Sequence, residues 1–176
     1  MREGRVAFAP RPATLPGMDD ASRIARVQAT LDALRYGGAI MRVAGSTHTA
    51  EQAAAAAGCA LGQIIKTLAV YVAGTPMLVL VAGDRRLDDR LVAGRAGVGR
   101  KQVKLASPGQ VLALTGYPVG GVSPFGLATP LAAVIDTSLR RFETVWVAAG
   151  SADAILPIAL DDLARYISGE FAEVSS

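Results

Sequence analysis

The eleven residues from Gly116 to Gly126 contain four glycines and two prolines, yet they do not form a repetitive linker. Glycine allows a backbone N–H group to approach a ligand with no Cβ in the way, and proline restricts the conformations of the surrounding chain. The segment follows a predicted helix that begins at Ser107 and Pro108 and ends at Gly116. It is therefore a shaped loop that can present main-chain N–H groups to an anion or to a carbonyl oxygen.

The rest of the sequence predicts helices and strands in mixed order. Apolar residues at helical spacing, capping boxes and terminal glycines predict helices over residues 20–34, 49–58, 87–96, 108–115 and 160–167. Runs rich in β-branched residues predict strands over residues 39–43, 64–73, 77–82, 102–105, 131–136 and 144–149. Because some strands arrive as a hairpin and others are separated by helices, the sequence predicts an α+β fold with a mixed sheet.

Length and composition predict one domain. The chain has 176 residues, of which 51% are hydrophobic, enough for one well-filled core. Residues 1–17 contain three prolines and two glycines without apolar periodicity, so we predict a flexible N-terminal tail and a domain over residues 18–176. No apolar run is long enough for a membrane span and no secretory signal is recognisable, which predicts a cytoplasmic protein without a membrane partner.

Positive charge is concentrated in one part of the chain. The net charge is only +3, but seven of the eighteen Lys and Arg residues lie within residues 85–104. This stretch is either a solvated helix and loop or a surface that faces phosphates. Under the second interpretation, the candidate phosphate contacts are Arg95, Arg100 and Lys101.

Several common sites are not encoded. A dinucleotide-binding glycine motif fails at Gln102, where glycine is required, and a Walker A motif fails because Ile65 and not glycine precedes Lys66. His48 is the only histidine, so a zinc site would depend on scattered carboxylates. The single cysteine, Cys59, excludes an intramolecular disulfide and a cysteine-cluster metal site. We predict no metal and no cofactor.

Nucleophile sites have weak support. Ser123, His48 and Asp136 supply the residue types of a triad, but Ser123 is not in a nucleophile-elbow motif. His48 is a candidate base or, alternatively, a cap or pocket-edge residue before the alanine-rich helix. Cys59 is a small buried hydrophobic residue or, alternatively, a nucleophile.

Lys66 interrupts a strand that otherwise reads as buried. Ile64, Ile65 and Leu68 surround it, and lysine is rarely buried without a partner or a function. Its ammonium group must therefore reach a cleft or a partner. The alternative is an edge-strand lysine whose ammonium simply extends into solvent.

Three motifs together resemble the YbaK/prolyl-tRNA synthetase-associated domain family. They are Gln63-Ile-Ile-Lys-Thr-Leu68, Thr115-Gly-Tyr-Pro-Val-Gly-Gly-Val-Ser-Pro124 and Val134-Ile-Asp136, and the resemblance covers about residues 39–167. Members of this family hydrolyse mischarged aminoacyl-tRNA, and their fold is a curved, barrel-like mixed β-sheet flanked by helices. The resemblance implies a free-standing trans-editing deacylase that acts on the acceptor end of mischarged tRNA, with a synthetase as a further candidate partner.

The resemblance also assigns roles to residues. Lys66 matches the catalytic lysine, and Gly120 and Pro124 match a Gly-x-x-x-Pro loop that holds the 3′ end of the ester. Asp136 matches an active-site carboxylate that could recognise the substrate's α-ammonium group. We therefore predict Lys66, Gly120 and Asp136 as catalytic residues. The predicted substrate-binding residues are Thr47, His48, Thr67, Gly121, Val122, Ser123 and Pro124. From the residues alone, the loop could instead be a tight connection and Asp136 an ordinary turn residue.

The sequence leaves the substrate side chain open among Cys, Ala, Ser and Thr types. We predict a hydrophobic pocket wall from Ile64, Leu68, Val119, Val122 and Phe125. The polar segment at residues 46–49 could take part in the choice of side chain. Two other functions remain open, a non-catalytic module that binds a synthetase or a nucleotide, and an esterase for other acyl groups.

Overall fold

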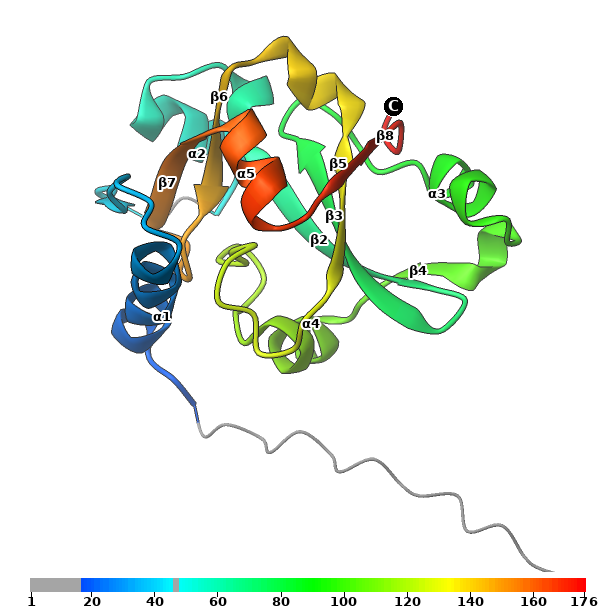
Figure 1. Cartoon of the computed structure of the whole chain (residues 1–176), viewed down its shortest axis with the longest axis horizontal. Coiled ribbons are helices and arrows are strands. Elements are labelled where there is room, and N and C mark those ends of the chain that lie inside the picture. Colours follow the sequence, from blue (N-terminus) through cyan, green and yellow to red (C-terminus); the bar gives the residue numbers. More distant parts are fainter. Residues whose placement is uncertain (1–16, 46–47) are drawn as a thin grey trace, which may run out of the picture.

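Two β-sheets have helices packed around them in this computed structural model, which describes residues 17–45 and 48–176 (Figure 1). The predicted tail at residues 1–17 lies, apart from Gly17, outside the described residues. The α-helices are α1 (Asp20–Ala33), α2 (Ala50–Ala57), α3 (Asp89–Ala96), α4 (Pro108–Thr115) and α5 (Leu160–Tyr166). None of the helices in the described part of the chain has the length and apolar character needed to cross a lipid bilayer.

The helices begin and end at the predicted caps. Thr49 and Gln52 form a capping box at the start of α2, and Ser107 accepts a hydrogen bond at the start of α4. Gly58 and Gly116 follow these two helices with φ values of 66° and 80°. This left-handed conformation favours glycine and stops each helix.

A mixed sheet and a smaller antiparallel sheet make up the strands. The five-stranded sheet has the order β4-β2-β3-β5-β8, and the three-stranded sheet has the order β1-β7-β6. The strands are β1 (Met41–Arg42), β2 (Ile65–Val72), β3 (Thr75–Ala82), β4 (Val103–Leu105), β5 (Ala132–Asp136), β6 (Thr144–Ala148), β7 (Ala154–Ala159) and β8 (Glu170–Ala172). Strands β2 and β3 form the predicted hairpin, whereas β3, β5 and β8 run parallel to one another. The predicted α+β class and mixed sheet are confirmed.

The two sheets approach each other without closing into a barrel. A single bridge joins Ile64, just before β2, to Trp146 of β6. A few residues later, the Ala69 carbonyl accepts a hydrogen bond of 2.9 Å from the Ala106 N–H group, at the end of β4. Between these two points, no described strand pairs with the outer edge of β2 at residues 65–68. The two sheets therefore leave a gap in the backbone pairing beside Lys66.

The main differences from the predicted elements lie in short strands. Strand β7 was not predicted because Pro157 stands in its middle. The proline is tolerated because β1 pairs with β7 only at Ala154 and Ile155, so no described strand pairs with that edge of β7 at Pro157. Strand β8 has only three residues, too few to show an alternating pattern. The strand predicted over residues 39–43 is reduced to Met41 and Arg42.

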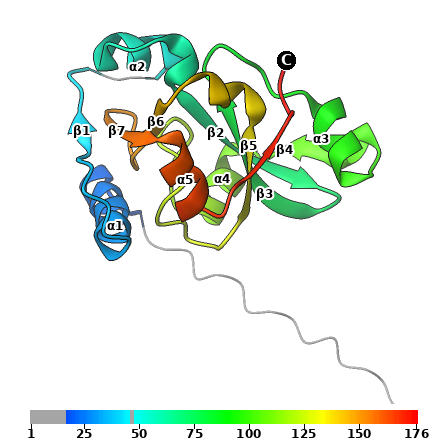
Figure 2. The same cartoon turned by 45° about the horizontal axis from the view of Figure 1, so that its top comes forward.

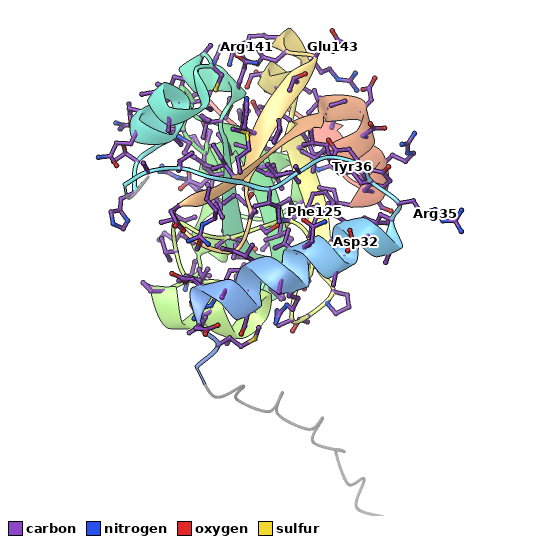
Figure 3. All side chains as sticks on the ribbon, turned by 90° about the vertical axis from the view of Figure 1, so that its left-hand side faces the viewer. Asp32, Arg35, Tyr36, Phe125, Arg141 and Glu143 are labelled. Carbon is purple, nitrogen blue, oxygen red and sulfur yellow. The ribbon has the colours of Figure 1, made fainter. Side chains whose placement is uncertain are left out.

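One hydrophobic core joins the two sheets to α1 and to the glycine loop. Its fully buried members include Val27 and Leu31 of α1, Tyr117 of the loop and Leu163 of α5. Figure 3 shows α1 lying across this side of the molecule. A second apolar cluster lies between α3 and the other face of the five-stranded sheet. The glycine loop is therefore packed against a helix that lies about a hundred residues earlier in the sequence.

Candidate active site

A cavity of about 430 Å³ lies beside the unpaired edge of β2. The start of α2, strand β2, the end of β4, helix α4, the glycine loop, strand β6 and residues 151–155 surround it. Most of the lining side chains are apolar, and the volume is within the range of small-molecule sites, roughly 300–1,000 Å³. The cavity can therefore hold a small ligand beside β2.

The cavity brings together part of the predicted site. The predicted catalytic and substrate-binding residues that line it are His48, Lys66, Thr67, Gly120 and Val122. The predicted wall residues that line it are Ile64, Leu68, Val119 and Val122. Gly121, Ser123, Pro124, Phe125 and Asp136 do not line it. Thr47 lies outside the described residues.

Lys66 is half-buried at one end of the cavity. Its ammonium group donates a hydrogen bond to the carbonyl oxygen of Arg85, just beyond the end of β3. Burial lowers the pKa of Lys66 and the charge of Arg86 lowers it further, while Glu51 and Asp84 act in the opposite direction. The ammonium group of this cavity-lining lysine is therefore partly desolvated, as functional lysines often are.

The glycine loop meets the cavity through Val119, Gly120 and Val122. Gly120 has a φ of 91°, and a Cβ at this position would meet no atom within 4 Å. The N–H group of Gly121 donates to the carbonyl of Pro118 at 3.0 Å. No acceptor for the N–H groups of Gly120 and Val122 is found among the described residues. These two groups are therefore the candidate donors to a ligand.

Thr67 contributes an unsatisfied hydroxyl to the same wall. Its Oγ1 atom is buried and has no hydrogen-bond partner within residues 17–45 and 48–176. An unpaired buried hydroxyl costs about 1–3 kcal/mol. Because Thr67 lines the cavity, its hydroxyl is a candidate partner for a polar group of a ligand.

Asp136 has a different environment from the one predicted. It is 1% exposed, and its carboxylate accepts hydrogen bonds from Ser138, from the Val174 N–H group at 3.0 Å and from the Ser175 hydroxyl at 2.8 Å. Burial alone would raise the pKa of Asp136, but these hydrogen bonds outweigh it and lower the pKa. A contact with the substrate's α-ammonium group would require this carboxylate to give up bonds that fix the chain near Ser175.

The alternative nucleophiles do not assemble into a site. The hydroxyl of Ser123 is buried and accepts a hydrogen bond from the Phe125 N–H group at 3.1 Å. Asp136 is bonded to other groups, so Ser123, His48 and Asp136 form no hydrogen-bonded triad. Burial raises the pKa of the Cys59 thiol, which does not line the cavity. Among the described side chains, no cluster of three or more His, Cys, Asp or Glu residues could hold a metal ion.

The three predicted phosphate contacts lie on α3 or just after it, away from α2. Figures 1 and 2 both show α3 at the opposite end of the molecule from α2. Arg95 forms an ion pair with Glu170, and Arg100 pairs with Asp89 at 2.7 Å. Lys101 is exposed and forms no ion pair with the described residues. Two of the three predicted phosphate contacts are therefore already matched with carboxylates.

The opposite wall of the cavity was not found from the sequence. It is formed by Trp146, Val147 and Ala148 of β6 and by Ser151 and Ile155. These residues come from an ordinary apolar strand, from the turn before β7 and from β7 itself, a strand that was not predicted. No local motif distinguishes them, and only their position across the gap from β2 makes them part of the site.

Comparison with known proteins identifies related domains. A model of the aminoacyl-tRNA editing domain matches residues 44–166. YwhH of Bacillus subtilis is 37% identical over 122 residues, which form 69% of this chain and 76% of YwhH. An Enterococcus faecalis protein named "Putative Cys-tRNA(Pro)/Cys-tRNA(Cys) deacylase EbsC" is 27% identical over 129 residues, 73% of this chain and 77% of that protein.

Longer proteins and solved structures share the domain. The proline–tRNA ligase of Nitratidesulfovibrio vulgaris strain DP4 is 37% identical over 109 residues, 62% of this chain but 19% of the ligase. A structure titled "Crystal structure of a putative trans-editing enzyme for prolyl tRNA synthetase" superimposes with a TM-score of 0.82 at 32% identity, covering 88% of this chain and 97% of that one. The predicted YbaK-like resemblance is confirmed, and the chain belongs to the family of aminoacyl-tRNA editing domains.

Proposed function

We propose that this protein is an editing enzyme that hydrolyses the ester between a small amino acid and the 3′ end of a mischarged tRNA. The family of editing domains acts as hydrolases on aminoacyl-tRNA esters. The observation that carries the proposal is that Lys66 and Gly120, from elements about fifty residues apart, line the same cavity of about 430 Å³. The substrate of such a reaction is aminoacyl-tRNA, which aminoacyl-tRNA synthetases produce in the cytoplasm.

The site offers two ways to stabilise the reacting ester. Water adds to the carbonyl carbon, the bond to the ribose oxygen breaks, and a proton is transferred to that oxygen, giving the free amino acid and uncharged tRNA. The developing oxyanion can accept hydrogen bonds from the N–H groups of Gly120 and Val122. The positive charge of Lys66 can stabilise the same oxyanion or bind the adjoining phosphate of the tRNA. Each such donor is worth about 10²–10³ in rate.

Apolar walls explain why a small side chain would be selected. Ala53, Ile64 and Trp146 line the cavity, and an apolar pocket distinguishes substrates that differ by one methylene by only about 1–3 kcal/mol. A synthetase has the same limitation, so a second, differently shaped pocket improves the accuracy of charging. The side chains that fit this proposal are those of Cys, Ala, Ser and Thr, and the unpaired hydroxyl of Thr67 is a candidate partner for a thiol or hydroxyl.

A panel of mischarged tRNAs tests the proposal. Purified protein is incubated with tRNAs carrying Ala, Cys, Ser or Thr, and release of the amino acid is followed with K66A as a matched control. We expect release from at least one substrate by the wild-type protein and little by K66A. The T67V variant removes only the hydroxyl, so it should reduce release of a thiol or hydroxyl substrate more than release of Ala. Binding of tRNA without release from any member of the panel would contradict catalysis and favour a non-catalytic module of the same fold.

A further inference from the structure

The two ends of the glycine loop are joined by one side chain from α1. The guanidinium group of Arg26 donates from Nε to the carbonyl oxygen of Gly126 at 2.6 Å. It also donates from Nη2 to the carbonyl oxygen of Thr115 at 3.3 Å. Thr115 and Gly126 stand at the start and at the end of the loop, so a single planar group bridges its base.

Tyr117 closes the same loop from inside. Its side chain is fully buried, and its hydroxyl lies 2.6 Å from the Phe125 carbonyl oxygen and 3.0 Å from that of Gly126. The guanidinium carbon of Arg26 lies 5.2 Å from the centre of the Tyr117 ring. Arg26 and Tyr117 thus stack on each other and bind neighbouring carbonyl groups at the end of the loop.

Two glycines of the loop make room for this arrangement. A Cβ on Gly116 would collide with the guanidinium group of Arg26. A Cβ on Gly126 would lie 2.7 Å from the Tyr117 hydroxyl oxygen, and both glycines have positive φ. In contrast, Gly120 has open space around it and lines the cavity. These three glycines therefore divide into a pair that admits the Arg26 and Tyr117 side chains and one that faces the cavity.

A second contact connects α1 to the cavity side of the loop. Gly150 packs against α1 so closely that a Cβ would lie 2.9 Å from the backbone of Arg23. Its N–H group donates to the Gly121 carbonyl at 3.1 Å. A Cβ on Gly121 would lie 2.8 Å from the Cα of Ser151. Backbone contacts thus continue from α1 through the turn at Gly150 to the residue next to Gly120.

Arg26 is not needed to attach α1 to the domain. Val27 and Leu31 of α1 are fully buried in the main core, and burial of two such side chains contributes about 1.5–3 kcal/mol each. Removing the guanidinium group should leave the helix in place and release the base of the loop. The interaction of Arg26 with the loop can therefore be removed without detaching α1 from the core.

We infer that Arg26 is a positioning residue for the editing reaction, which sets the conformation of the loop carrying Gly120 by bridging the carbonyl groups of Thr115 and Gly126. Helix α1 ends at Ala33, before the segment at residues 44–166 that matches the editing domain. The inference rests on the proposed function, and it makes α1 part of the machinery that shapes the site. Tyr117 supports the same loop from inside the core.

Substitution of Arg26 by methionine tests this role, because methionine keeps much of the aliphatic stem and removes the donors. We expect R26M to lower kcat for deacylation by roughly tenfold to a hundredfold at a temperature where the protein is fully folded. R26K should recover part of this loss, since one ammonium group reaches one carbonyl but does not form the planar bridge. The matched control is R35M, because Arg35 points into solvent at the other end of α1 (Figure 3). R35M should behave as the wild type.

The outcomes separate positioning from stability. A lower melting temperature for R26M with wild-type kcat and KM would overturn the inference and leave Arg26 a purely structural residue. If R26M does not fold, R26K and Y117F carry the test, and wild-type kcat in both would equally overturn it. If the wild-type protein deacylates no substrate, the proposed function fails instead. In that case, hydrogen exchange of the Gly120 and Val122 amides tests the role of Arg26 without an activity assay. Equal exchange rates in R26M and R35M would show that Arg26 does not set the conformation of the loop.

Discussion

Lys66 and Gly120 reach the cavity from two walls that are held in different ways. Lys66 belongs to β2, which is paired with β3 along its whole length from Ile65 to Val72. Gly120 belongs to a loop whose base is closed by the side chains of Arg26 and Tyr117. The first wall is supported by many similar backbone hydrogen bonds, and the second by a few specific contacts.

This difference has consequences for substitutions. In the strand, a side chain facing the cavity can be replaced while the backbone ladder keeps its place. In the loop, each contact determines part of the backbone path, so a change can alter both the ligand site and the stability. We therefore expect activity and stability to separate on the β2 wall and to change together on the loop wall.

The largest expected effect is that of K66A on the β2 wall. Loss of the ammonium group should lower the deacylation rate by about 10²–10³, with a melting temperature close to that of the wild type. The matched control is K104A, which removes an exposed lysine from the neighbouring strand β4. A K66A protein that turns over at the wild-type rate would contradict a catalytic role. A K66A protein that does not fold would show that the hydrogen bond to Arg85 is structural.

A pair of adjacent glycine variants tests the loop wall. G120A places a Cβ in open space but at a φ of 91°, a strain of about 1–2 kcal/mol for a non-glycine residue. G121A has no such strain, but its Cβ would lie 2.8 Å from the Cα of Ser151. We expect both to lower the deacylation rate roughly tenfold by moving the loop N–H groups, with the larger loss of melting temperature in G121A. If both variants keep a wild-type rate, the loop does not position the ester.

Sequence patterns predicted the structural features that are determined by residues close together in the chain. The capping box at Thr49, the stop at Gly58 and the β2–β3 hairpin are encoded within a few residues, and all three are found. The loop at Gly116–Gly126 was also evident, because its glycines and prolines are adjacent in sequence. Family motifs then placed Lys66 and Gly120, which the structure brings to one cavity.

Contacts between distant segments could not be predicted in this way. Arg26 lies 100 residues before Gly126, and nothing around it in the sequence indicates a bridge to a loop. Trp146 enters the cavity only because β6 faces the unpaired edge of β2. Asp136 closes an apolar strand, as the sequence shows, but the partners that occupy its carboxylate include Val174 and Ser175, from a short C-terminal segment.

The hydrogen bonds of Asp136 offer a test of what stabilises the chain next to Lys66. The segment that Asp136 binds continues to Ser176, which exchanges two backbone hydrogen bonds with Arg86, next to the residue that holds Lys66. D136N should lower the free energy of unfolding by about 2 kcal/mol at pH 7, because an amide replaces a hydrogen-bonded carboxylate. E173Q, on an exposed neighbour, is the control.

The pH dependence identifies the charged form of Asp136 as the stabilising one. Its pKa in the folded protein lies below the ordinary value of 3.8, so its contribution is complete above that pH and is lost as the pH falls through the folded pKa. Urea denaturation should show a constant difference between wild type and D136N from neutral to mildly acidic pH, and a smaller difference below 3.8. A difference that does not shrink in acid would mean that the carboxylate charge is not what stabilises this segment.

The smallest effect is expected at the α3 end, which neither wall of the cavity includes. Arg95 and Arg100 are already paired with Glu170 and Asp89, so of the three predicted phosphate contacts only Lys101 has no ion pair with a described residue. Replacing all three cations by glutamine should reduce the slope of log K for tRNA binding against log salt by about 0.7–0.9, the value of one contact. A reduction near three times that amount would make α3 a tRNA surface in its own right, with its ion pairs exchanged for phosphates. An unchanged slope would leave it a solvated face, and tRNA would then be held only near the cavity.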